Sequence, residues 1–369
     1  MNNNIDELRG ILEAQMKMPV KMASDEQFAT GYWPTRSMPI DAVLGGGWVK
    51  GRMALLTGES QTLKTRVALE SIASVQAENG TAALIDTEHA FNRDWAVDLG
   101  VDPKRLMLIQ PDVAEEAVDQ MEVLIRNGID MIAFDSIAAM LPDSDRAIML
   151  SGKDNPQPAR IAALMSIALR KLNTANLRTQ ILWITQKRAN IGAMAFAPKT
   201  NDTGGKAIEF YVSQKLELKK TGKIYREVNY WNGEKEATDR QIVAQQFRVE
   251  LTKARNRQPF AISHFVYDLE NNGIDMASYL IGEALVDGVV TKKGAWWTYT
   301  VVDSDGVVLA EHKAGSKDKF KALVEDDPVV WNLLLNHVAD KYDLEASDYG
   351  LRSDEAESEG VHAVLEGSV

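Results

Sequence analysis

One segment of the chain combines a glycine, a lysine and a threonine at a spacing that suits phosphate chemistry. It lies between an apolar run and a helical pattern and comes close to the phosphate-binding pattern Gly-x4-Gly-Lys-Ser/Thr. That pattern wraps backbone N–H groups around phosphates at a helix N-terminus and adds a lysine for the β- and γ-phosphates and a hydroxyl for Mg²⁺. Leu63 replaces the second glycine, so an ordinary strand–turn–helix with a surface lysine stays open as an alternative. The nucleotide site would consist of Gly58, Glu59, Ser60, Gln61, Thr62, Leu63, Lys64, Thr65 and Arg66.

Three further polar residues, Glu88, Asp135 and Gln186, follow apolar runs downstream of this segment. Because the carboxyl ends of parallel strands meet in one crevice, we expect all three to lie close to Gly58. Asp135 would hold Mg²⁺ beside Thr65, directly or through water, and Glu88 would act as the general base on the attacking water. The alternatives are that Asp135 caps the next segment and that Glu88 interacts with a helix dipole.

Short apolar runs and helical patterns alternate between about residues 29 and 269. The runs cover residues 53–57, 82–86, 106–109, 131–134 and 181–185, and the clearest helical patterns cover 64–79, 114–127 and 159–176. Such alternation predicts an α/β fold with a mostly parallel sheet flanked by helices on both faces. Later runs at 215–219, 247–252 and 262–267 lack helices between them and predict an antiparallel extension, with a long hairpin over 220–245.

The two ends of the chain differ from this central part. Residues 1–22 predict a short amphipathic helix that ends at Pro19, with one apolar face formed by Ile5, Leu8, Ile11, Leu12 and Met16. A lone helix of this length is not stable in isolation, so it docks either on its own core or on a neighbouring subunit. After Asp275 the pattern predicts two short helices, a hairpin around 296–309 and one or two more helices. We therefore expect an N-terminal oligomerisation segment (1–30), a core (31–270), a small α+β C-terminal domain (271–341) and an acidic, disordered tail (342–369).

Composition excludes several classes of function. The chain has no cysteine, so disulfides, thiolate catalysis and thiolate metal sites are excluded, and its 5 scattered histidines have no zinc-ligand spacing. No apolar run approaches the ~20 residues that cross a bilayer, and the N-terminus lacks the order of a secretory signal, so we expect a cytoplasmic protein. The net charge of −12 argues against a nucleic-acid partner, but residues 340–369 contribute −7 of it. This acidic tail is either solvated or a competitor for a basic DNA-binding groove.

Longer motifs resemble the bacterial RecA family in order and spacing. They are Ile-Asp-Thr-Glu-His-Ala at 85–90, Phe-Asp-Ser-Ile-Ala-Ala-Met-Leu-Pro at 134–142, and Ile191-Gly followed by Thr203-Gly-Gly-Lys-Ala and Phe210-Tyr211. The resemblance runs from about Thr35 to Pro259 and continues more weakly through residues 294–297. In lacking the second glycine of the phosphate-binding pattern, the chain is similar to the phage UvsX-type recombinases, which also depart from the pattern there. This likeness suggests a phage or otherwise divergent member.

This resemblance implies a RecA-type P-loop ATPase core and gives roles to individual residues. Trp95 would lie against adenine, and Gln186 would sense the γ-phosphate. Lys253 and Arg255 would reach the ATP of the adjacent subunit and stabilise charge on its γ-phosphate, with Phe210 as an interface aromatic. The catalytic residues implied are Lys64, Glu88, Gln186, Lys253 and Arg255.

The family likeness also implies two DNA-binding loops. The segment 187–207 resembles the second loop, in which Ile191 would wedge between bases, and the first loop falls within about 150–160. Backbone and cationic contacts in these loops position phosphates without reading sequence. The residues implied are Arg160, Lys187, Arg188, Ile191, Gly192, Lys199, Gly204, Gly205 and Lys206.

The function implied is that of an ATP-dependent DNA recombinase that forms helical nucleoprotein filaments on single-stranded DNA and exchanges strands with double-stranded DNA. Its cofactors would be ATP and Mg²⁺, and single-strand-binding and mediator proteins would be further partners. A hexameric RecA-fold helicase or translocase is a second reading, although such motors normally carry a larger N-terminal domain than the roughly 30 residues that precede this core. A non-hydrolysing ATP-binding filament or mediator protein is a third interpretation. It stays open because Leu63 replaces a glycine of the phosphate-binding pattern.

Overall fold

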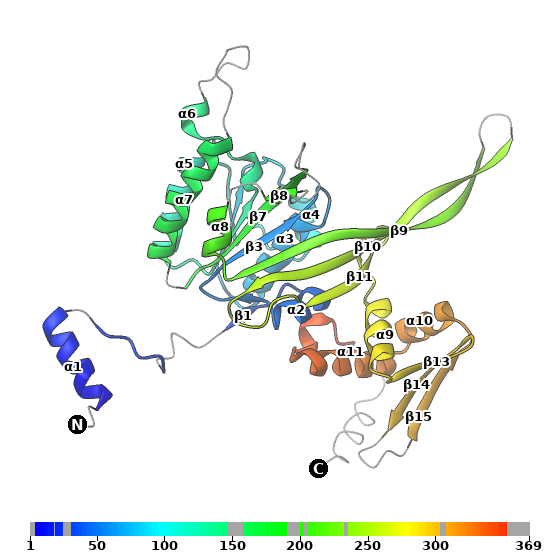
Figure 1. Cartoon of the computed structure of the whole chain (residues 1–369). Helices are drawn as coiled ribbons and strands as arrows, with labels where there is room; N and C mark the ends of the chain where they lie inside the picture. The colour runs from blue at the N-terminus through cyan, green and yellow to red at the C-terminus, as the bar shows by residue number, and fades with distance from the viewer. Residues whose placement is uncertain are drawn as a thin grey trace. The chain divides into compact units, whose positions relative to one another are not determined.

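A computed structural model of the chain describes residues 4–17, 19–24, 31–146, 158–176, 178–189, 200–202, 206–231, 235–302 and 308–352 (Figure 1). The chain divides into two compact units, Met1–Tyr32 and Trp33–Val369. No helix within these described ranges is long and apolar enough to cross a membrane. The division of the chain into four domains remains a prediction.

Over its described residues, the first unit contains one helix, α1 (Ile5–Met16). The Asn4 side chain caps its N-terminus by accepting a hydrogen bond from the Asp6 N–H at 3.2 Å. The helix is shorter than the pattern predicted, because Lys17 adopts a left-handed conformation (φ 53°) and donates its N–H to the Glu13 carbonyl. All members of the predicted apolar face are exposed, so none of the described residues of this unit covers the face: Ile5, Leu8, Ile11, Leu12 and Met16.

A 10-stranded sheet, counted over the described residues, forms the centre of the second unit (Figure 1). Its order is β12-β11-β10-β9-β3-β7-β6-β4-β5, with β8 paired to β7 off this path. The parallel strands are β3 (Met53–Gly58), β4 (Ala82–Asp86), β5 (Leu106–Ile109), β6 (Met131–Asp135) and β7 (Gln180–Ala189). The antiparallel extension consists of β9 (Gln214–Trp231), β10 (Glu236–Ala254), β11 (Ile262–Asp268) and β12 (Gly273–Ile274). β9 is parallel to β3, which joins the two parts and confirms the predicted fold class.

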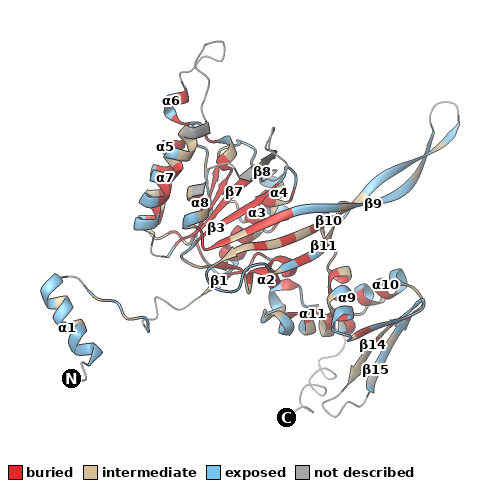
Figure 2. Cartoon of the chain, viewed as in Figure 1, coloured by how far each residue is buried: buried red, intermediate tan, exposed pale blue. Residues whose placement is uncertain are grey.

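Helices cover both faces of the parallel strands. Residues of α2 (Met38–Leu44) and α3 (Lys64–Ala77) belong to one hydrophobic cluster. Residues of α5 (Ala114–Arg126), α7 (Pro158–Ala175) and α8 (Lys206–Tyr211) belong to another. Every residue of β3, β4 and β6 is buried as a result (Figure 2), which explains why these strands are continuous apolar runs. The shorter elements are β1 (Tyr32–Trp33), β2 (Trp48–Val49), α4 (Arg93–Asp98), a 3-10 turn (Ile137–Ala139), α6 (Asp143–Arg146) and β8 (Thr200–Asp202).

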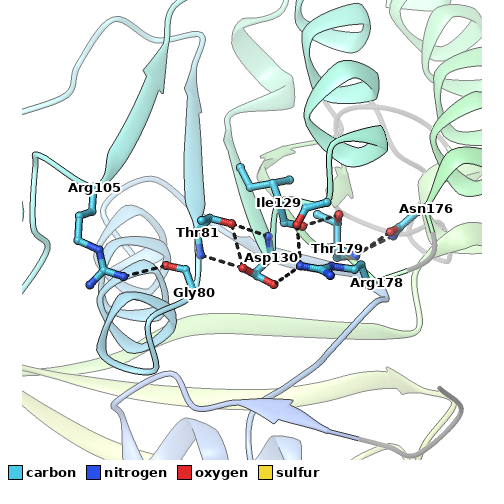
Figure 3. Close-up of polar contacts among 9 residues, drawn as sticks. Gly80, Thr81, Arg105, Ile129, Asp130, Asn176, Arg178 and Thr179 are labelled. Carbon is cyan, nitrogen blue, oxygen red and sulfur yellow. Dashed lines mark hydrogen bonds and ion pairs between the residues drawn. The ribbon is translucent and has the colours of Figure 1, made fainter. Parts of the chain in front are cut away.

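Polar side chains tie the sheet together where β4, β6 and β7 begin (Figure 3). The Asp130 carboxylate accepts hydrogen bonds from the N–H and the hydroxyl of Thr81, both at 2.9 Å, and from Arg178 at 3.2 Å. Thr179 donates its hydroxyl to the Ile129 carbonyl at 2.7 Å. The polar groups at this edge are thus hydrogen-bonded to one another, which holds the starts of β4, β6 and β7 in place. The candidate site residues lie at the opposite ends of these strands.

β9 and β10 continue past the rest of the sheet as a long two-stranded ribbon (Figure 1). β11 pairs only with residues 244–250 of β10, so the ribbon beyond this point is held by its own ladder and is mostly exposed (Figure 2). The hairpin predicted over 220–245 is confirmed. Over the described residues, the register of the whole β9–β10 ladder shifts at three places, including one between Gln246 and Phe247, where β10 also pairs with β11.

The C-terminal part begins with α9 (Met276–Val286) and a 3-stranded antiparallel sheet of β13 (Val290–Lys293), β14 (Trp296–Val302) and β15 (Val308–Ala314). It ends with α10 (Lys317–Asp326) and α11 (Pro328–Tyr342). The prediction of two short helices before the hairpin was wrong. The second is β13, because this segment pairs along β14. The buried apolar residues of this part belong to the same cluster as those of α2 and α3.

Packed structure continues past the predicted end of the C-terminal domain at Lys341. A 3-10 helix (Ala346–Tyr349) follows α11, and the buried Tyr349 donates its hydroxyl to the carboxylate of Asp41 at 2.9 Å. The predicted start of a disordered tail at residue 342 was therefore wrong, because an aromatic side chain anchors this stretch. The rest of the predicted tail, residues 353–369, lies outside the described residues.

Candidate active site

Side chains at the carboxyl ends of β3, β4, β6 and β7 line one cavity of about 620 Å³. Gly58 lies opposite Gln186 in the β3–β7 ladder, and Asp135 lies opposite Asp86 in the β4–β6 ladder. The predicted convergence of the strand ends is therefore present. The prediction that Gln186 ends its strand was wrong, because β7 continues to Ala189. Gln186 is instead the last residue of β7 that pairs with β3.

The loop after β3 wraps around the ammonium group of Lys64. Lys64 Nζ donates to the Gly58 carbonyl (3.2 Å), the Glu59 carbonyl (2.6 Å) and Thr62 Oγ1 (3.2 Å). The loop needs glycine at 58, because a Cβ there would lie 2.5 Å from the Leu218 carbonyl oxygen. Burial lowers the pKa of Lys64. With only 7% of this residue exposed, the alternative of a surface lysine is excluded.

Leu63 directly precedes α3 and has a left-handed backbone, with φ 63° and ψ 10°. Glycine adopts this conformation freely, whereas another L-residue there costs about 1–2 kcal/mol. The leucine side chain is half-buried and packs against the cluster that contains the apolar face of α3. The loop thus keeps a conformation that favours glycine, and packing of the leucine offsets part of its cost.

Thr65 and Asp135 form an oxygen pair beside this loop. Thr65 donates its hydroxyl to Asp135 Oδ2 at 2.6 Å. Burial raises the pKa of Asp135 to about 6; the Thr65 hydrogen bond opposes this rise, and the nearby Glu88 carboxylate adds to it. Mg²⁺ is typically bound by one or two protein oxygens together with phosphates and waters. This pair fits such a shared ion, and the described residues contain no group of three or more His, Cys, Asp or Glu that could hold a metal alone.

Glu88 is exposed on the loop that follows β4 and is oriented by two donors. Its Oε1 accepts hydrogen bonds from Ser136 Oγ (2.6 Å) and Gln186 Nε2 (3.3 Å). The backbone of Ser136 is held in turn, because its N–H donates a hydrogen bond to Thr87 Oγ1 at 3.0 Å. The peptide bond between Asp135 and Ser136 is cis. The carboxylate can therefore reach a water in the cavity while its orientation is held. Sequence reasoning missed the role of Ser136, whose only signal was its place directly after Asp135.

Aromatic side chains line another part of the cavity, where Trp95 of α4 and Tyr267 of β11 both contribute. Arg66 donates to the Tyr267 hydroxyl at 2.7 Å and to Glu70 at 2.8 Å. Flat rings of this kind bind a nucleobase by stacking. Trp95 was predicted for this role. Tyr267 was not, because nothing in the alternation of its strand distinguishes it from a core residue.

Comparison with known proteins agrees with this geometry. The RecA N-terminal domain matches residues 13–274. Protein RecA of a Nocardioides species is 35% identical over 312 residues, which cover 84% of this chain and 82% of that protein. The chain belongs to the RecA family. Protein RecA of a Thermotoga species is 32% identical over 334 residues, covering 89% and 88%, and that of Nocardia farcinica is 37% identical over 300 residues, covering 80% and 79%.

Membership of the RecA family establishes the activity. The protein is an ATP-dependent recombinase of DNA recombination and repair, and its ATPase activity depends on DNA. That the residues around Lys64, Asp135 and Glu88 form its ATPase site stays a prediction. The phage or otherwise divergent subtype suggested by Leu63 stays a prediction.

The two cations expected to act on a neighbouring ATP do not line the cavity of their own chain. Arg255 donates to the Phe210 carbonyl at 2.6 Å, and Lys253 donates to the same carbonyl at 3.3 Å and also contacts the Glu209 carbonyl. The Phe210 ring at the end of α8 is 69% exposed. Lys253, Arg255 and Phe210 thus form one surface cluster, which we call the cation cluster.

The DNA-binding prediction falls largely outside the described residues, which include neither residues 150–157 of the predicted first loop nor Ile191, Gly192, Lys199, Gly204 and Gly205. Arg188 lies in β7 and Lys206 in α8, but their side chains are not described. Lys187 forms an ion pair with Glu217 at 2.6 Å, and Arg160 forms one with the buried Asp145. In this structure both cations therefore neutralise carboxylates of the same chain, which their sequence context did not predict.

Proposed function

We propose that the protein polymerises on single-stranded DNA as a helical filament, with ATP and Mg²⁺ at the contacts between subunits, and exchanges strands with double-stranded DNA. The observation that supports this best is the separation of the site into two parts. The phosphate loop, the oxygen pair and Glu88 line the cavity, whereas the cation cluster of the same chain lies outside it. A neighbouring subunit that supplied its cation cluster would complete the site.

In the proposed mechanism Lys64 contacts the β- and γ-phosphates of ATP. Thr65 and Asp135 would hold Mg²⁺, which neutralises charge on the phosphates when bound. Glu88 orients the attacking water and takes its proton. Lys253 and Arg255 of the adjacent subunit stabilise the charge that develops on the γ-phosphoryl group.

Gln186 links this site to DNA. Its side chain donates to Glu88, and β7 continues from Gln186 to Ala189 through the first residues of the predicted second DNA loop. A γ-phosphate that repositions Gln186 would therefore change the start of that loop. Because coupling between two binding sites is reciprocal, DNA would raise affinity for ATP by the factor by which ATP raises affinity for DNA.

The exposed apolar face of α1 supports self-association, since burying it against a neighbouring subunit removes apolar surface from water. We further propose a cytoplasmic location, and single-strand-binding and mediator proteins as partners during filament assembly.

Electron microscopy of the protein with single-stranded DNA and a non-hydrolysable ATP analogue tests the proposal. We expect continuous helical filaments that need the nucleotide, and we expect Lys64→Ala to prevent them. Closed rings instead of filaments would contradict the proposal and indicate a translocating motor. Filaments that form equally without nucleotide would contradict an ATP site between subunits.

A further inference from the structure

One wall of the nucleotide cavity comes from the β9–β10 ribbon and not from the ends of the parallel strands. Lys220 and Lys223 of β9 and Gln245 and Phe247 of β10 line this wall. We call these four residues the ribbon wall. Three of the four are polar, and two of those are cations in a chain with a net charge of −12.

A β-bulge brings the two lysines to the same face of the ribbon. Side chains alternate along a strand, so residues three apart normally point to opposite faces. The β9–β10 register shifts between Gln246 and Phe247, which leaves Thr221 as an extra residue without a partner opposite. The extra residue reverses the alternation, so Lys223 returns to the face of Lys220. Bulges next to active sites commonly re-aim side chains in this way.

The lysines lie beside two different parts of the nucleotide site. Lys220 Nζ donates to the Ser60 carbonyl in the phosphate loop at 3.1 Å. Lys223 pairs with Gln245 across the ribbon, and Gln245 pairs in turn with Tyr267 of β11. The ribbon wall therefore extends from the phosphate loop to the aromatic part of the cavity.

Both ammonium groups have donors available for an anion. An ammonium group has three donors, and the one hydrogen bond of Lys220 is to a carbonyl, not to a carboxylate. Across the residues that the structure covers, the ammonium group of Lys223 has neither a hydrogen-bond nor an ion-pair partner. Lys219 differs: it lies outside the cavity and is ion-paired with Glu217 at 2.9 Å. A cavity wall with two uncompensated cations suits a polyanion.

We propose that Lys220 and Lys223 bind the nucleotide of their own subunit and hold the anionic groups of ATP from the ribbon side of the cavity. This inference rests on the proposed nucleotide site and adds two binding residues to it. It also gives the ribbon a role in the ATPase, since displacement of β9 at its bulge would move both cations relative to the phosphate loop.

The test is the affinity of the full-length protein for a fluorescent ATP analogue, measured without DNA. We expect Lys220→Ala and Lys223→Ala each to weaken binding about fivefold, at the upper end of what exposed ion pairs contribute. Lys220→Arg and Lys223→Arg should restore most of the loss, because the charge is kept. Lys219→Ala is the matched control, since it removes a neighbouring lysine that does not line the cavity, and it should bind the analogue as the unmodified protein does.

Lys64→Ala separates this inference from the nucleotide site itself. If Lys64→Ala loses binding while the alanine variants at 220 and 223 match the Lys219→Ala control, the lysines are not nucleotide ligands and the site stands. If those two variants keep nucleotide affinity but lose affinity for single-stranded DNA, the ribbon wall binds DNA and the inference is overturned. If Lys64→Ala binds as well as the unmodified protein, the nucleotide site is wrong and the inference falls with it.

Discussion

Substitutions at Leu63 measure the energetic cost of a left-handed leucine in the phosphate loop. Its backbone, at φ 63° and ψ 10°, should cost about 1–2 kcal/mol relative to glycine. Leu63→Gly removes this cost but also loses the half-buried side chain, worth roughly 1 kcal/mol, since full burial of a leucine stabilises by about 1.5–3 kcal/mol. Leu63→Ala loses the side chain and keeps the strained backbone. We therefore expect the glycine variant to be more stable than the alanine variant by about 1 kcal/mol.

Gln120 provides the matched control because it is exposed on the right-handed helix α5. There the order should reverse, with Gln120→Ala more stable than Gln120→Gly by about 1 kcal/mol. The measurement is the thermal unfolding midpoint of the four variants without nucleotide, where 1 kcal/mol corresponds to about 2 °C for a domain of this size. If alanine is at least as stable as glycine at both positions, Leu63 carries no left-handed strain and the reasoning is refuted.

The remaining predictions concern three ionisable groups, Asp135, Glu88 and Asp41. Because burial raises the pKa of Asp135 to about 6, Mg²⁺ affinity in the presence of ATP should fall about tenfold between pH 7.5 and pH 5, as measured by calorimetry. The folded state also holds this proton more tightly than the unfolded state does, so the contribution of Asp135 to stability should be lost as pH rises from about 4 to 6. Asp135→Asn should remove this contribution and reduce the fall in Mg²⁺ affinity. Glu88→Gln should keep ATP affinity but lower DNA-dependent hydrolysis by about 10²–10⁴-fold, and an unchanged rate would exclude Glu88 as the base. Burial raises the pKa of Asp41 to about 7, so this carboxyl is mostly charged at pH 8 and mostly protonated at pH 6. Tyr349→Phe removes a hydrogen bond to it and should cost about 1–3 kcal/mol of folding stability at pH 8 and less at pH 6. Equal losses at both pH values would contradict this account.

The sequence by itself determined the parallel sheet and the strand ends at which the residues of the proposed ATPase site meet. Strands buried on both faces must be continuous apolar runs, and β3, β4 and β6 are such runs. Because parallel strands end at one edge, Lys64, Asp135, Glu88 and Gln186 could be placed together before any contact was known. The motifs around these residues also carried the family resemblance, which the comparisons confirmed.

Only the tertiary structure decided which other residues join the site. Tyr267 and Lys223 are more than a hundred residues from the phosphate loop, and they reach the cavity because β9, β10 and β11 extend the sheet on the far side of β3. The bulge at Thr221 is a matter of register between two strands, which depends on both partners and not on the local pattern. The ion pair of Lys187 with Glu217 likewise joins β7 and β9, two strands that both flank β3. Local periodicity shows which face of an element is buried, but the choice of partner is made by packing and register across the whole sheet.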